Sequence, residues 1–275
     1  MIMTRRSGSL LTLALCSVGS AGAAVSVTGP SFTYTQNFNT LASTTSPTPT
    51  IAAWVNDTTI PGWNLFTSTL AAPTTYRAEY GDQDTGSFTS YGGIGSTDRA
   101  LGAVGYSGAY FGSPATGAAA GYIAAAFTNN AGTTLNSFTL GFSGEQWRWS
   151  GTTPHSMTMQ YGFGATFAAV ASWASLGASF TFTSPLTSGT PQGGVDGNGI
   201  GRVTGLGGTQ ATSWSAGQTL WLRWLVPNTA NSFQGTGIDD ASLSVTAVPE
   251  PASLLLFAAG FAVIVGAARK RTRGG

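Results

Sequence analysis

Apolar and polar residues alternate over short runs through most of this chain, and clusters of Gly, Pro, Asn and Ser separate the runs. Alternation with a period of two residues is typical of a strand with one buried face. The runs that fit it best predict strands at Ser31–Phe38, Ser137–Ser143, Ser156–Tyr161, Ser179–Thr183, Thr219–Leu225 and Ala241–Thr246. Many short strands joined by Gly-rich turns predict an all-β body, a β-sandwich most consistent with a jelly roll.

One run shows how the alternation assigns faces to the predicted strands. Leu220, Leu222 and Trp224 fall on one face, and Trp221 and Arg223 fall on the other. We therefore expect the first three side chains in the core.

Three stretches predict loops between the strands. Ala42–Thr50 is rich in Ser, Thr and Pro, and Gly189–Gly208 is rich in Gly, so we expect both at the surface. Ala115–Ala126 contains glycines that disfavour a helix, and it predicts a loop that leads into a strand.

The N-terminus has the pattern of a secretory signal peptide. Arg5 and Arg6 precede a short apolar run, and small residues follow at Ala21–Ala24. We predict a signal helix over residues 1–24, with cleavage after Ala23 or Ala24. Cleavage would remove Cys16, the only cysteine of the chain, so a disulfide within the chain is excluded.

The C-terminus has three parts. Pro249, Glu250 and Pro251 interrupt any regular structure, because each proline restricts the residue before it. Residues 252–268 carry no charge and predict a short transmembrane helix. A basic end follows, which the positive-inside rule keeps in the cytoplasm; it consists of Arg269, Lys270, Arg271 and Arg273.

This order of parts, over residues 248–275, resembles the PEP-CTERM sorting signal of Gram-negative bacteria. The resemblance implies export through the Sec route, an intermediate lodged in the inner membrane through the C-terminal helix, and processing by an exosortase. Pro249, Glu250 and Pro251 would be the recognition element of that enzyme, and the product would reach the cell surface or the medium. Such proteins are often linked to extracellular polysaccharide and biofilm matrix. A plain C-terminal anchor is the alternative.

The body, residues 25–247, also resembles a β-module that recurs in PEP-CTERM proteins and has no settled activity. The phrases that carry this resemblance are Gln36–Leu41, Pro61–Trp63, Asp98–Gly102, Gly144–Arg148, Leu220–Trp224 and Ile238–Asp240. The likeness supports the fold and the domain limits rather than a function.

Charge excludes one class of partner. The whole chain has a net charge of +1, but between the two terminal segments it carries five arginines, no lysine and nine acidic residues. No basic patch can neutralise a phosphate backbone, so we expect no nucleic-acid binding. So few arginines in so neutral a body predict specific ion pairs: Glu145–Arg148, Asp98–Arg99 and Asp240–Arg223.

The sequence contains few of the residue patterns that catalysis requires. The only histidine, His155, lies in a predicted exposed turn, and no nucleophile elbow surrounds a serine. One histidine and one cysteine cannot form a typical zinc site. A glycoside hydrolase would pair Glu145 with an aspartate, which is the weaker alternative here. We therefore expect no enzymatic activity and no catalytic residue.

Two acidic residues are candidates for a structural calcium. Asp239 and Asp240 follow a Gly–Thr–Gly turn, and calcium prefers carboxylate and carbonyl oxygens. Pairing of the first and last strands would bring Asn37 or Asn39 near Asp239. The alternative is that both acids cap the turn through backbone amides. We expect no other cofactor.

Eight tryptophans suggest carbohydrate contact as well as core packing. Trp147 and Trp224 have the phase of core residues, whereas Trp149 and Trp221 are the better candidates for an exposed platform. The chain is thus predicted to be an exported matrix or cell-envelope protein associated with exopolysaccharide. The main alternative is a carbohydrate-binding module with this platform and calcium.

Overall fold

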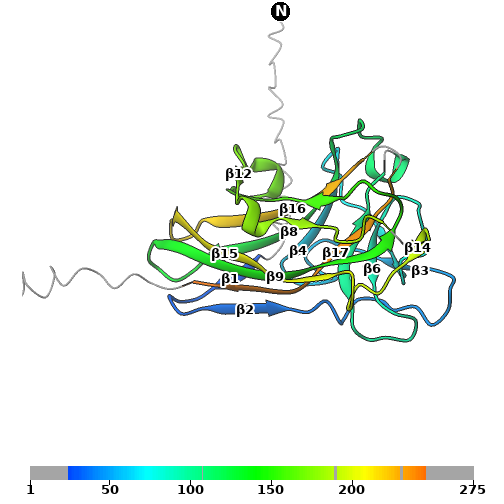
Figure 1. Cartoon of the computed structure of the whole chain (residues 1–275). Helices are drawn as coiled ribbons and strands as arrows, with labels where there is room; N and C mark the ends of the chain where they lie inside the picture. The colour runs from blue at the N-terminus through cyan, green and yellow to red at the C-terminus, as the bar shows by residue number, and fades with distance from the viewer. Residues whose placement is uncertain (1–23, 107, 189–190, 230–231, 246–275) are drawn as a thin grey trace, which may run out of the picture.

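The computed structural model describes residues 24–106, 108–188, 191–229 and 232–245 (Figure 1). The predicted signal helix up to Ala23, the Pro249–Pro251 motif, the predicted transmembrane helix and the basic end lie outside these residues. Within the described ranges, no helix is long and apolar enough to cross a membrane.

One sheet, sheet A, is centred on the long strands β8 and β16, which pair antiparallel. Beside β8 lie β4, antiparallel, and β1, parallel, while β11 and then β12 continue the sheet beyond β16. The strands of sheet A are β1 (Val25–Val27), β4 (Trp63–Thr67), β8 (Ala119–Asn129), β16 (Thr219–Pro227), β11 (Met159–Phe163) and β12 (Ala174–Ser175).

The other sheet, sheet B, is centred on β9 and β17, which pair antiparallel. Strands β14 and β15 pair with the free edge of β9, and β17 pairs with β7 at its start and with β2 at its end. The strands of sheet B are β14 (Gly193–Gly194), β15 (Arg202–Trp214), β9 (Leu135–Trp149), β17 (Gly235–Ser244), β2 (Thr33–Gln36), β7 (Ala100–Val104), β6 (Ser87–Tyr91), β5 (Thr75–Glu79) and β3 (Thr50–Ala53).

Short elements connect and flank the two sheets. A small two-stranded sheet pairs β10 antiparallel with β13, and single turns of 3-10 helix lie in the loops. Their bounds are β10 (Ser156–Met157), β13 (Phe182–Thr183), η1 (Ala109–Phe111), η2 (Phe167–Ala169) and η3 (Ala178–Phe180).

The main core lies between the two sheets, which stack as a sandwich. Leu220, Leu222 and Trp224 of β16 are fully buried in it, as their alternation predicts. The ring of Trp224 meets Phe142 of β9 edge to face, with centroids 5.5 Å apart. The all-β sandwich is thus confirmed, while the jelly-roll topology stays a prediction.

An N-terminal strand and the last strand are neighbours in sheet B. Strand β2 pairs with β17 from Gln36 opposite Ala241 to Thr33 opposite Ser244. The N–H of Val245 then donates a 3.0 Å hydrogen bond to the carbonyl of Phe32. The body is therefore fastened by backbone pairing up to Val245.

Two predictions of local structure are wrong. The predicted loop Gly189–Gly208 contains β14 and the start of β15, because glycine lets one strand approach another closely. A Cβ at Gly207 would lie 2.0 Å from the Leu140 carbonyl oxygen of β9. The predicted strand Ser179–Thr183 is divided between η3 and β13, and the loop before η3 contains Gly177 at a φ of 87°.

Candidate binding cleft on sheet A

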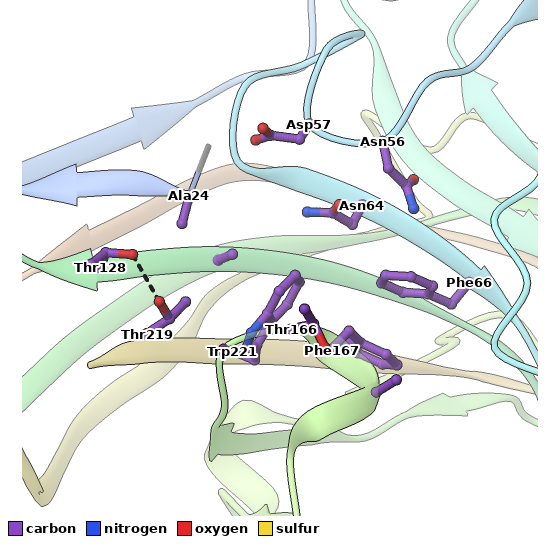
Figure 2. A pocket seen from close by; sticks show the side chains of 13 residues that line it. Ala24, Asn56, Asp57, Asn64, Phe66, Thr128, Thr166, Phe167, Thr219 and Trp221 are labelled. Carbon is purple, nitrogen blue, oxygen red and sulfur yellow. Dashed lines mark hydrogen bonds between the residues drawn. The ribbon is translucent and has the colours of Figure 1, made fainter. Parts of the chain in front are cut away.

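A cleft of about 380 Å³ lies on the face of sheet A that points away from the core (Figure 2). In β4, Trp63 and Leu65 point into the core, so Asn64 and Phe66 point to the outer face. The same alternation directs Trp221 outward from β16. The lining residues are Ala24, Asn56, Asp57, Asn64, Phe66, Ala126, Thr128, Ala165, Thr166, Phe167, Ala168, Thr219 and Trp221.

Aromatic rings form one side of this cleft. Phe66 and Phe167 are stacked, with centroids 4.1 Å apart, and Trp221 meets Phe167 edge to face at 5.5 Å. The indole Nε1 of Trp221 donates a 3.1 Å hydrogen bond to the Gly164 carbonyl. At the start of η2, the Thr166 hydroxyl accepts from the Ala169 N–H and so holds Phe167 in place.

Trp221 is consequently not the exposed platform that we predicted. It is 8% exposed, because Phe167 and its loop fold back over the outer face of the sheet. The phase of the strand gives the direction of Trp221 correctly, but it does not reveal a covering segment more than fifty residues earlier. Trp221 contributes to the cleft as part of its wall.

Polar groups from β4 and from the loop before it form the other side. Asp57 has a φ of 62°, and its Oδ1 accepts a 2.6 Å hydrogen bond from the Gly62 N–H. Asn56 bonds both backbone groups of Leu65, which ties the loop to β4. The Nδ2 of Asn64 donates to the Gly62 carbonyl at 3.2 Å.

Two oxygens of this polar side are left for a ligand. Among the described residues, the hydrogen bonds of Asp57 and Asn64 engage Oδ1 and Nδ2 respectively. Oδ2 of Asp57 and Oδ1 of Asn64 therefore remain as acceptors at the cleft. Across it, the hydroxyls of Thr128 and Thr219 bond each other at 2.9 Å, and one of them accepts that bond.

Arg223 lies on the same outer face, beyond Trp221. Its guanidinium carbon is 3.9 Å from the ring centroid of Trp173 and 4.5 Å from that of Tyr122. Its Nε donates to Gln160 Oε1 at 2.9 Å. The predicted Asp240–Arg223 pair is therefore wrong, because Arg223 belongs to sheet A whereas Asp240 belongs to sheet B.

Asp240 and Glu145 instead share Arg202. The Nη2 of Arg202 bonds Asp240 Oδ2, and its Nε lies 3.8 Å from Glu145 Oε1. Arg202 and Glu145 are register partners on β15 and β9, which explains the contact. The predicted Glu145–Arg148 pair is wrong: Arg148 donates to the carbonyls of Gly81 and Asp82.

The third predicted ion pair, Asp98–Arg99, is not formed either. The Arg99 side chain is buried, and it donates to the hydroxyl and carbonyl oxygens of Ser90. Its backbone N–H donates to Oδ1 of Asn39 at 2.8 Å. Within the described residues, Nε and Nη2 of Arg99 thus bond neutral acceptors, whereas its buried Nη1 has no hydrogen-bond partner.

Glu145 and Asp239 are buried carboxyls with perturbed acidity. The pKa of Glu145 is raised to about 8, chiefly by burial and also by the nearby Asp239, although the Trp147 hydrogen bond and Arg202 act to lower it. Burial also raises the pKa of Asp239 to about 7, with Asp240 and Asp98 adding to the rise. Trp147 donates to Glu145 Oε2 at 2.8 Å and is itself buried, as predicted.

The residues predicted for calcium have different surroundings. Asp239 is buried, whereas Asp240 is exposed and engaged by Arg202. Asn37 lies with Asp240 in a shallow hollow beside β2. Within the described part of the chain, no three His, Cys, Asp or Glu side chains are grouped so as to hold a metal ion. Structural calcium stays a prediction.

Two other sequence candidates have clear positions. His155 is 1% exposed, so its predicted placement in an exposed turn is wrong. Its segment pairs with the neighbourhood of Ser184, whose hydroxyl accepts from the His155 N–H, and burial lowers the pKa of His155 to about 4. Trp149 is half-buried near the end of β9, opposite Gly193, and its role as a platform stays a prediction.

Comparison with known families identifies the C-terminal segment. The PEP-CTERM protein-sorting motif matches residues 247–271, as the resemblance implied. The chain carries this sorting signal, which indicates processing by an exosortase, export, and a membrane-anchored intermediate that precedes surface or extracellular delivery.

Comparison of the body with known proteins yields little information. No curated protein matches the chain. A solved structure described as "Crystal structure of Agl-KA catalytic domain" is similar over 84% of this chain and 30% of that chain, with 12% sequence identity and a TM-score of 0.25. The chain thus spans less than a third of that structure.

Proposed function

We propose that this chain is a cell-surface or extracellular-matrix protein without catalytic activity, exported through the Sec route, and that it binds polysaccharide in the cleft on sheet A. The observation that carries the proposal is the composition of the cleft, with stacked aromatic rings on one side and fixed amide, hydroxyl and carboxylate groups on the other. The sorting signal supports the proposed location, because it indicates delivery of the body to the outside of the cell.

This combination of groups matches the chemistry of a sugar. The apolar C–H face of a pyranose packs on aromatic rings, and its hydroxyls need both donors and acceptors. Phe66 is half-buried and lines the cleft, so its ring provides an apolar contact. Asp57, Asn64 and the Thr128–Thr219 hydroxyl pair provide the polar partners.

The fixed geometry of the cleft also favours binding. Asn56, Asp57 and Asn64 are held by hydrogen bonds to the backbone of their own loop and strand. Little side-chain freedom is therefore lost when a ligand binds, which reduces the entropic cost of association.

A binding experiment with variants tests this assignment. Purified protein is titrated calorimetrically with exopolysaccharide fragments from the producing strain. Phe66→Ala should weaken binding at least about fivefold, because a stacked ring contributes about 1 kcal/mol or more. Tyr106→Ala is the matched control, since Tyr106 is an exposed aromatic residue outside the cleft.

The outcome is decided by the contrast between the two variants. Equal affinity of Phe66→Ala and Tyr106→Ala, with both proteins folded by circular dichroism, would remove the cleft from the binding site. Analysis of the same mixtures for released oligosaccharides tests the absence of catalysis, and steady release by the wild type would contradict that part.

A further inference from the structure

The first described residue lies at the cleft. Strand β1 begins at Val25 and runs parallel to β8, with Val25 opposite Phe127. This pairing fixes the backbone just before Val25, and Ala24 lines the cleft together with Asp57 and Asn64 (Figure 2).

Signal-peptide cleavage is predicted at this same point. Cleavage after Ala23 makes Ala24 the first residue, and cleavage after Ala24 makes Val25 the first residue. In either case a neutral amide of the precursor becomes a positively charged α-ammonium group. Processing thus changes the charge at the cleft without any change in the side chains.

Gly62 lies close to both the start of β1 and the carboxylate of Asp57. Its N–H donates to Asp57 Oδ1 at 2.6 Å. A Cβ placed on Gly62 would lie 2.4 Å from Val25 Cγ2 and 3.5 Å from the Val25 nitrogen. The start of β1 and the Asp57 carboxylate therefore both lie close to the same glycine.

Asp57 has no cationic partner among the described residues. The close arginine–carboxyl contacts of that part of the chain are those of Arg202 with Glu145 and Asp240. The body contains no lysine, and its arginines are Arg77, Arg99, Arg148, Arg202 and Arg223. None of them lines the cleft. A negative charge at a cleft of neutral groups favours a nearby cation.

We propose that removal of the signal peptide completes the cleft, because the new α-ammonium group pairs with Asp57 and becomes a donor to the bound polysaccharide. The ion pair rests on this geometry and on the predicted cleavage after Ala23 or Ala24, whereas the contribution to binding rests on the function proposed above. In the precursor the lone carboxylate repels acidic sugars, and in the mature protein the ammonium group offsets that repulsion.

The absence of lysine from the body makes this pair measurable. Reductive methylation with ¹³C-formaldehyde labels amines, so mature protein that has lost its C-terminal segment gives a single α-amine signal. Its N-terminus is first defined by mass. An ordinary α-ammonium group has a pKa of about 7.7–8.0. NMR titration should give a pKa higher by about half a unit or more, because the carboxylate stabilises the charged form.

Asp57→Asn should return this pKa to the ordinary range while keeping the Oδ1 acceptor for Gly62. Asp84→Asn, at an exposed site, should leave the raised value unchanged. An ordinary pKa in the wild type, a raised pKa that persists in Asp57→Asn, or a mature N-terminus away from residues 24 and 25 would each overturn the proposal.

A second measurement separates this inference from the proposed function. Two residues, Gly-Ser, are added before the mature N-terminus, which moves the ammonium group away but leaves the side chains intact. Affinity for the exopolysaccharide fragments should fall severalfold at unchanged thermal stability, and unchanged affinity would overturn the role in binding. A raised pKa in a wild type that binds no polysaccharide would support the pair and refute the polysaccharide-binding function.

Discussion

Glu145 makes a quantitative prediction about pH and stability. Its carboxyl is 1% exposed, and its pKa rises from 4.5 to about 8, chiefly because burial disfavours the charged form. In the unfolded chain the same carboxyl ionises near 4.5. Between these two values the unfolded state releases a proton that the folded state retains, so rising pH favours unfolding.

The size of the effect follows from the shift. One proton corresponds to about 1.4 kcal/mol per pH unit, so Glu145 contributes a loss of up to about 5 kcal/mol between pH 4.5 and 8. The stabilisation is fully present below pH 4.5 and is lost as pH rises through about 8. Asp239, with a pKa of about 7, adds to the slope over much of the same range.

The assay is urea unfolding at each unit from pH 5 to 9, with wild type and Glu145→Gln. The amide keeps an acceptor for Trp147 Nε1 and stays neutral at every pH. In the variant, the free energy of unfolding should therefore fall less steeply with pH, by the slope that one proton contributes. Above pH 8 it should be more stable than the wild type. The charged groups near Glu145, which are Asp239, Asp98 and Arg202, are unchanged in this comparison.

The contrary result is a slope that is equal in the two proteins. It would mean that Glu145 is ionised in the folded state, with Arg202 outweighing burial. Asp84→Asn is the control, because Asp84 is exposed, and its slope should match the wild type.

Three further predictions concern the packing and the processing of the chain. Gly81→Ala should destabilise the body by several kcal/mol in urea unfolding, because φ is +98° and a Cβ would lie 1.7 Å from the Trp147 carbonyl oxygen. Gly95→Ala is the control: φ is +75° but the space around it is open, so the substitution should cost only about 1 kcal/mol. Arg223→Met should lower the melting temperature by a few degrees, since it removes the contacts with Trp173 and Gln160, and an unchanged value would show that these contacts contribute nothing. The mass of the protein recovered from cells and medium should lack the leader and about the last 25 residues if the motif at 247–271 is processed, whereas a membrane-bound product with residues 252–275 would identify a plain anchor.

The sequence predicts strands well where one face is buried and the other is polar. Strand β16 shows this pattern, and its Leu220, Leu222 and Trp224 are in the core. Strands β6 and β7 give no alternation, because all of their residues are buried. Strand β15 contains three positive-φ glycines, Gly205, Gly207 and Gly208. Glycines grouped in this way predict a loop, because the sequence does not show the neighbouring strand with which they pair.

The cleft is harder to predict than the strands. It combines residues from the loop at Asn56 and Asp57, from β8, from η2 and from β16, which are brought together by sheet pairing. In the sequence, Pro61–Trp63 stands out only as one of the phrases that carry the resemblance to the β-module, and it does not indicate which residues face the loop. Phe167 lies in a segment that carries no alternation, so its position over Trp221 could not be inferred from the sequence.

The hydrogen bond at the end of β17 limits how far the sorting motif can lie from the folded body. Val245 is held by its bond to Phe32, and Pro249 follows four residues later. A chain of four residues spans at most about 14 Å, however it is arranged. The exosortase must therefore bind its motif within about 14 Å of the folded sandwich. The body restricts access to the motif, so the enzyme needs an active site that is open enough to admit it beside a folded domain.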